Sequence, residues 1–122
     1  MDAYLYVADK LKKLGRDAES EEWYDDADKY YQQLSQLGSG GSLEAKALTY
    51  RAEIARIHQD WTGAAGLLIQ VYDRFPRTDA GRRALIRASL LYRQKLGQPQ
   101  VADSLMEVLR TSLADLLPTP EM

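Results

Sequence analysis

The chain has 122 residues, which is enough for one domain with a modest hydrophobic core. The absence of cysteine excludes disulfides and thiolate metal sites, and the net charge of −2 argues against nucleic acid as the default partner. No apolar run approaches the roughly 20 residues that a membrane span needs, so we expect a soluble domain. Its compartment stays open, and a cytoplasmic or a bacterial periplasmic or envelope location would suit this composition.

The first 37 residues predict a pair of helices. Apolar residues recur at intervals of three and four before Gly15, as in a helix with one buried face. A glycine at that place suits the left-handed conformation in which many helices end. Asp17 is then the expected N-cap of the second helix. The glutamates that follow it would be stabilised by the partial positive charge at the N-terminus of a helix.

Residues 38–42 read Gly-Ser-Gly-Gly-Ser, which is the composition of an engineered flexible linker. A natural loop of the same composition is the alternative. The linker would either replace a longer loop between two helical pairs or join a partner segment to its receptor. We therefore divide the chain into residues 1–37, the linker at 38–42, and residues 43–122.

The two segments that flank the linker differ in charge. Residues 1–37 carry five basic and nine acidic side chains, whereas residues 43–122 carry eleven basic and nine acidic ones. The segments thus have net charges of −4 and +2, which predicts electrostatic attraction between them. An origin of the two segments in two different proteins, or in two distant parts of one protein, would explain this difference in net charge.

The central helical pair is expected between residues 43 and 76. Small residues at Ala52 and Ala64 would let its two helices approach closely. In the turn between the helices, Thr62 is a plausible N-cap and Asp60 is its rival. Pro76 lacks a backbone N–H and is expected to stop the second helix.

A third pair is expected to follow, with Asp79 as its N-cap. Gly97 would end the first helix of this pair, and Pro99 would lie near the first position of the next one. The last helix is expected to run to Leu117 and to cap the stack, because solenoids need a polar outer face at their ends.

The central pair resembles a tetratricopeptide (TPR) repeat. If a 34-residue unit starts at Ala45, its eighth, twentieth, twenty-fourth and thirty-second places hold the residues that the family prefers there: Ala52, Ala64, Leu68 and Pro76. The unit departs from the family at its eleventh place, Ala55, and at its twenty-seventh, Val71. The resemblance also covers the first pair, although its closing proline is missing. Counted from Met1, its eighth, eleventh, twentieth, twenty-fourth and twenty-seventh places hold Ala8, Leu11, Ser20, Tyr24 and Ala27.

This resemblance implies an all-α fold of about six helices, stacked as antiparallel hairpins. It also implies a concave groove that is lined by five places of each first helix. In the first unit these places hold Asp2, Leu5, Asp9, Lys12 and Lys13. In the second they hold Lys46, Thr49, Glu53, Arg56 and Ile57. In the third, counted from Gly81, they hold Arg82, Leu85, Ser89, Tyr92 and Arg93. The family's carboxylate-clamp pattern is absent, because the chain contains no asparagine.

Residues that could carry other chemistry have simpler explanations. His58 is the only histidine and stands near a helix end, without the further ligands or the oriented base that metal binding or catalysis would need. An acidic cluster lacks the glycine and glutamate of a calcium loop and suits a solvated helix face: Glu21, Glu22, Asp25, Asp26 and Asp28. The third pair carries a basic face, which is better explained as a solvated helix surface or a groove for an acidic peptide than as a nucleic-acid site. Its residues are Arg82, Arg83, Arg87, Arg93 and Lys95.

The sequence therefore predicts a non-catalytic module that binds a protein or peptide, possessing no catalytic, cofactor or metal site. The alternative is a fusion in which residues 1–37 are a partner's helical hairpin, tethered to a two-repeat receptor at high effective concentration. An enzyme has least support, since the chain shows no phosphate loop and no paired nucleophile and base. The short linker leaves both a monomer and a domain-swapped dimer open.

Overall fold

The structure, a computed structural model, describes residues 3–36 and 41–116. These residues form six α-helices and no strand, which confirms the all-α fold class. The helices are α1 (Ala3–Lys13), α2 (Asp17–Gln36), α3 (Ser42–Ile57), α4 (Trp61–Arg74), α5 (Asp79–Gln94) and α6 (Pro99–Leu116). Part of the expected linker, 38–40, and the expected end of the last helix at Leu117 lie outside the described residues. Ser42, assigned to the linker from composition, is the first residue of α3.

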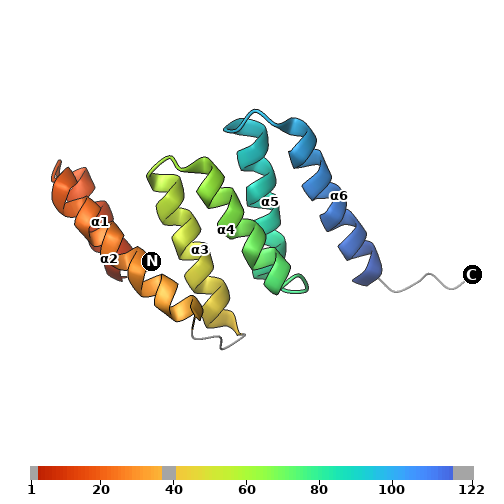
Figure 1. The fold of residues 1–122 in the computed structure, drawn as a ribbon, viewed down its shortest axis with the longest axis horizontal. Coiled ribbons are helices and arrows are strands. Elements are labelled where there is room, and N and C mark those ends of the chain that lie inside the picture. The colour runs from red at the N-terminus through yellow and green to blue at the C-terminus, as the bar shows by residue number, and fades with distance from the viewer. Residues whose placement is uncertain (1–2, 37–40, 117–122) are drawn as a thin grey trace, which may run out of the picture.

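Consecutive helices pair in an antiparallel manner and follow one another along a row (Figure 1). Each described helix packs against its neighbours in the chain, and the contact between α3 and α5 is the one packing between non-consecutive helices in this part of the chain. The pair α1–α2 therefore stands at one end of the row, and α6 stands at the other. Because α3 and α5 touch only weakly, a strip of surface between these two helices is hollowed.

Two helix starts differ from the expected ones by one residue, and the third is decided between its two candidates. Asp60, and not Thr62, caps α4, because its side chain accepts a hydrogen bond of 3.0 Å from the backbone N–H of Gly63. Thr78, and not Asp79, caps α5 in the same way, accepting from Gly81 at 3.0 Å. Asp17 is the first helical residue of α2 and so lies one position inside the expected cap.

The helix ends and turns follow the sequence more closely. Gly15 and Gly97 both have the left-handed backbone conformation expected of them, with φ of 76° and 63°. Pro99 is the first residue of α6, as its fixed φ and missing N–H favour. His58 is the C-cap of α3, which confirms that it is a helix-end residue. Gln59 after it adopts φ of 62°, which is unusual for a residue with a side chain.

Small residues occupy the points where the two helices of a pair cross. Ala52 and Ala64 are both buried, as expected for the central pair. In the first pair Ser20 donates a hydrogen bond of 2.8 Å to the backbone oxygen of Ala8. In the third pair the donor is Ser89 and the acceptor is the backbone oxygen of Ala102, at 3.1 Å. These close contacts hold each helical pair together.

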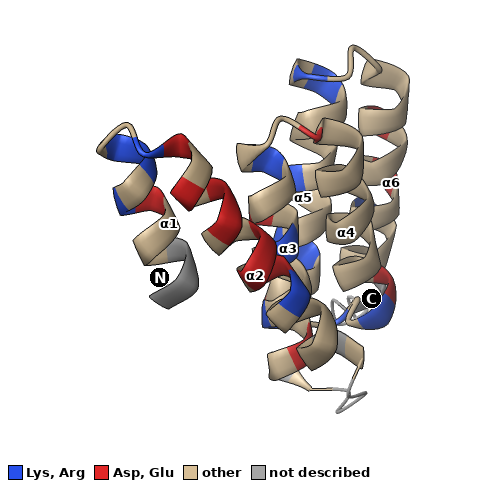
Figure 2. Cartoon of the chain, turned by 60° about the vertical axis from the view of Figure 1, so that its left-hand side comes forward, with Lys and Arg blue, Asp and Glu red and all other residues tan. Residues whose placement is uncertain are grey.

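The pair α1–α2 packs on α3 through aromatic and charged side chains of α2. Tyr24 and Tyr31 are buried in one cluster with residues of α3. Asp28 of α2 binds Arg51 of α3 at 3.0 Å, and Glu21 of α2 lies 2.7 Å from the Nε2 atom of His58. Figure 2 shows the acidic residues along α2 beside the basic residues of α3. The acids of the first segment thus face bases of the second, as their net charges predict.

Candidate functional site

The strip between α3 and α5 is hollowed into two pockets that meet at Arg87. The first has a volume of about 510 Å³ and an apolar floor from both helices and the turn before α5. The floor consists of Ala45, Tyr50, Phe75, Ala80 and Ala84. The backbones of α3 and α5 stand apart here, and the small side chains on both helices do not fill the space between them. The pocket can therefore accept an apolar side chain of a ligand.

The rim of this first pocket is basic. Lys46 of α3 and Arg83 of α5 line it together with Arg87, and no acidic side chain does so. Lys46 and Arg83 make no ion pair or side-chain hydrogen bond with any residue that the structure describes. The Thr49 hydroxyl, also at the rim, donates to the backbone oxygen of Ala45 at 2.8 Å. Two cations thus stand beside an apolar floor without an anionic partner.

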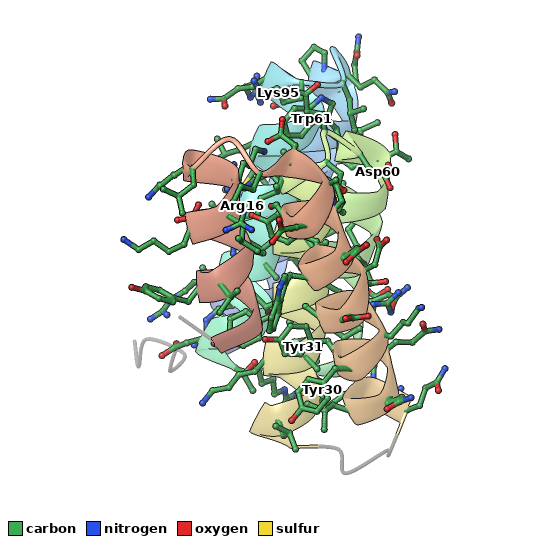
Figure 3. The ribbon with its side chains drawn as sticks, turned by 90° about the vertical axis from the view of Figure 1, so that its left-hand side faces the viewer. Arg16, Tyr30, Tyr31, Asp60, Trp61 and Lys95 are labelled. Carbon is green, nitrogen blue, oxygen red and sulfur yellow. The ribbon has the colours of Figure 1, made fainter. Side chains whose placement is uncertain are left out.

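The second pocket, of about 320 Å³, continues from Arg87 toward the turns at the other end of the helices. Arg56, Trp61 and Lys95 line it above an apolar base. The Lys95 ammonium lies 5.0 Å from the centre of the Trp61 ring, which places a cation on an aromatic face. Figure 3 shows these two residues side by side at one end of the molecule.

A third hollow of about 500 Å³ extends this path to the first helical pair. It shares Arg56 and Trp61 with the second pocket, and its far side is formed by Asp9, Lys12 and Lys13 of α1. Lys13 is paired with Asp9 at 3.0 Å. Neighbouring hollows thus share lining residues, Arg87 between the first two and Arg56 with Trp61 between the last two, and we call the three hollows together the basic groove.

Glu53 is the acid at the centre of the basic groove. Its carboxylate accepts hydrogen bonds from the Nε atom of Arg56 at 3.0 Å and from Arg87 at 3.1 Å. The hydrogen bond from Arg56 is the main reason why the pKa of Glu53 lies below its usual value, with the charges of Arg56 and Arg87 adding to this effect and burial opposing it. Glu53 therefore stays ionised and holds two arginines that line the groove.

Seven of the groove residues expected from the sequence line this path: Asp9, Lys12, Lys13, Lys46, Thr49, Arg56 and Ile57. Glu53 stands between the arginines of the groove, and Ile57 lines the third hollow with Asp9. Asp2 lies outside the described residues, and the side chain of Leu5 is also outside them. The first two helical pairs thus present their expected places toward a common path.

The residues expected from the third pair lie elsewhere. Leu85 and Ser89 are buried, and Ser89 is engaged with Ala102. Arg82 is paired with Asp79, Arg93 is paired with Asp103, and Tyr92 is half-buried and lines none of the described pockets. The groove side of α5 consists instead of Arg83, Arg87, Leu90 and Gln94.

This difference has a single cause, which is the register of the third unit. Counting from Gly81 put Ala88 at the crossing point, but the structure puts Ser89 there, one residue later. One residue turns a helix by about 100°, so each expected place points away from the groove. Counting back from the helix ends gives the right register, since Ala8, Ala52 and Ser89 each stand five residues before the last residue of their helix.

The other candidate residues take structural places. The expected acidic cluster is divided: Glu21 and Asp28 bind α3, whereas Glu22, Asp25 and Asp26 are exposed. Within residues 3–36 and 41–116, no group of three acidic, histidine or cysteine side chains is arranged to hold a metal ion. In the same part of the chain, no helix combines the length and the apolar character that crossing a membrane requires.

Comparisons of the chain with protein-family models, with curated proteins and with solved structures found no match.

Proposed function

We propose that this chain is a non-catalytic, TPR-like interaction module whose basic groove binds a peptide segment that carries acidic and apolar side chains. The observation that carries this proposal is the pair of cations beside an apolar pocket, Lys46 and Arg83, which have no anionic partner among the residues that the structure describes. A cation at the rim of an apolar pocket gains an anionic partner only from a ligand. The apolar floor gains burial from the same ligand.

The groove also has the extent that a peptide needs. Its three hollows follow one another across α1, α3 and α5, so successive side chains of a bound segment would each meet a different hollow. Trp61 with Lys95 offers an aromatic face at the middle of this path. Peptide grooves on helical scaffolds bind in this way, with a few anchoring side chains in pockets and charges that set the register.

The test is a selection from a phage-displayed library of random 12-residue peptides on the intact chain. We expect enriched peptides that combine Asp or Glu with large apolar residues. We expect these peptides to lose at least about tenfold in affinity on the double variant Lys46→Glu, Arg83→Glu, which replaces two favourable charge contacts by repulsive ones. The matched control is Arg77→Glu, because Arg77 is exposed and lines none of the described pockets.

Two outcomes would overturn the proposal. One is the absence of any peptide enriched above an uncoated surface. The other is a set of peptides that binds the double variant as tightly as it binds the wild-type chain and the Arg77→Glu control.

The second candidate is the tethered complex, in which residues 1–37 are a bound partner segment. The charge pattern of the α2–α3 contact favours it, since Asp28 binds Arg51 and Glu21 binds His58, with each acid on the first segment. Residues 43–122 should then fold when expressed alone and bind a separate peptide of residues 1–37. Failure of the two pieces to associate would exclude this candidate and leave the first one standing.

A further inference from the structure

The two ends of the row of helices expose side chains that the interior of the row covers. This becomes clear when the three helical pairs are aligned on their crossing points, which are Ala8 with Ser20, Ala52 with Ala64, and Ser89 with Ala102. The hydrogen bonds of Ser20 and Ser89 define the first and the third of these points. Corresponding positions in the three pairs can then be compared directly.

The second helix of each pair carries a large side chain four residues after the crossing point. Tyr24 is 1% exposed under α3, and Leu68 is 2% exposed under α5. The corresponding residue of the last pair, Met106, is 39% exposed, because no further pair follows it within the described chain.

Eleven residues after the crossing point the same pattern recurs. Tyr31 of the first pair is buried, and Phe75 of the second is half-buried. Leu113, the corresponding residue of the last pair, is 40% exposed. It lines a shallow hollow with Leu109 and with Ile86 of α5. We call Ile86, Met106 and Leu113 the tail face.

The opposite end exposes the matching half of the same contact. In α3, the residues two before and six after the crossing point are Tyr50 and His58. Tyr50 lies against Tyr31 in a tilted arrangement with ring centres 5.0 Å apart, and His58 and Tyr24 form a T-shaped pair with ring centres 5.4 Å apart. The corresponding residues of the first pair are Tyr6 and Leu14, which are 54% and 70% exposed. We call Tyr6, Lys10 and Leu14 the head face.

We propose that the head face of one copy of this chain docks on the tail face of a second copy, repeating the contact by which α3 packs on α2. By correspondence with the interior of the row, Tyr6 would lie against Leu113, and Leu14 would lie against Met106. Asp103 and Glu107, which flank Met106 on α6, are already paired with Arg93 and Arg110, so apolar contact and not charge would hold the two faces together.

Because the two faces differ, the contact is head to tail and does not close as a two-fold dimer. Each added copy leaves one head and one tail free, so the chain would form open rows or rings, depending on the rotation between copies. This assembly does not depend on the proposed function. Lys12 and Lys13 near the head face and Arg83 beside the tail hollow also line the basic groove, but none of Tyr6, Leu14, Met106 and Leu113 does.

The experiment uses sedimentation velocity on the intact chain and on two blocked variants. The head-blocked variant is Tyr6→Glu with Leu14→Glu, and the tail-blocked variant is Met106→Glu with Leu113→Glu. We expect the wild-type mass to rise with concentration and each blocked variant alone to stay monomeric. An equimolar mixture of the two should form one-to-one dimers and nothing larger, since one intact head and one intact tail remain.

The matched control for the tail-blocked variant is Val108→Glu. Val108 is also an exposed apolar residue of α6, but its counterpart in the second pair is Gln70, which is exposed within the row as well. The control should assemble like the wild type, and circular dichroism melts confirm that every variant is folded. A wild-type chain that stays monomeric up to about 1 mM would overturn the proposal. Blocked variants that assemble alone, or a mixture that stays monomeric, would also overturn it.

Discussion

The hydroxyl of Ser89 donates a hydrogen bond of 3.1 Å to the backbone oxygen of Ala102, and both residues are buried where α5 crosses α6. Ser20 and Ala8 make the same contact in the first pair, with the serine on the second helix. Each bond ties two helices at the point where their backbones are closest. The crossing point thus tolerates a small hydroxyl as well as a methyl group, provided that the hydroxyl finds a carbonyl across the contact.

Replacing Ser89 by alanine should therefore lower the free energy of unfolding by about 1 kcal/mol, which is the usual net contribution of one such hydrogen bond. Urea denaturation measures this change. Ser104→Ala is the control, because the Ser104 hydroxyl is exposed and bonds only to Gln100 of its own helix. An equal loss of stability in both variants would contradict a special role for the crossing point.

Two helical glycines should respond to alanine in opposite directions. A Cβ atom at Gly81 would collide with the backbone oxygen of Phe75, so we expect Gly81→Ala to destabilise the fold by about 1–3 kcal/mol. Gly66 has no atom within 4 Å of the place its Cβ would take, so Gly66→Ala should stabilise α4 by up to about 1 kcal/mol. Thermal denaturation of both variants compares them, and changes of the same sign would refute this account.

The ends of α1 and α3 offer a matched pair of left-handed residues. Gly15 has φ of 76° and Gln59 has φ of 62°, and each follows a helix end at which a backbone bond reaches back five residues: Arg16 to Leu11 and Asp60 to Ala55. A side chain in this conformation costs about 1–2 kcal/mol. Gly15→Gln should therefore destabilise the fold by about 1 kcal/mol, whereas Gln59→Gly should stabilise it. The denaturant midpoints of the two variants measure these changes in stability, and a loss of stability in Gln59→Gly would contradict the expectation.

The lowered pKa of Glu53 predicts a pH dependence of stability. The folded protein holds this carboxylate ionised below its ordinary pKa of 4.5, so the unfolded chain binds the proton more readily. Its contribution is complete above pH 4.5 and is lost as the pH falls through the lower folded value. Glu53→Gln should thus show a shallower loss of stability on acidification than the wild type.

Urea titrations at several pH values between about 3 and 7 measure this difference. Glu107→Gln serves as the control, because Arg110 also lowers the pKa of Glu107 but that pair lies on the open surface. We expect the control to follow the wild-type curve more closely. Identical curves for Glu53→Gln and the wild type would exclude a stabilising role for the Arg56–Glu53–Arg87 group.

The sequence alone determined the six helices and most of their ends. Apolar periodicity sets the helical segments, and Gly15, Gly97 and Pro99 act through local backbone preferences that need no tertiary contact. Its error at Thr78 and the choice it left open between Thr62 and Asp60 are also local, since two nearby side chains could each cap the helix and the backbone geometry selects one.

The tertiary structure alone decided which side chains share a surface. Whether Ala88 or Ser89 marks the crossing point depends on how α5 meets α6, and that choice rotates every side chain of α5 relative to the groove. The pairing of Glu53 with Arg87 and the place of Arg83 at the rim of the first pocket, without an ion pair to any described residue, follow from the same rotation. A helix carries its period in its sequence, but the direction in which it faces is set by packing against its neighbours.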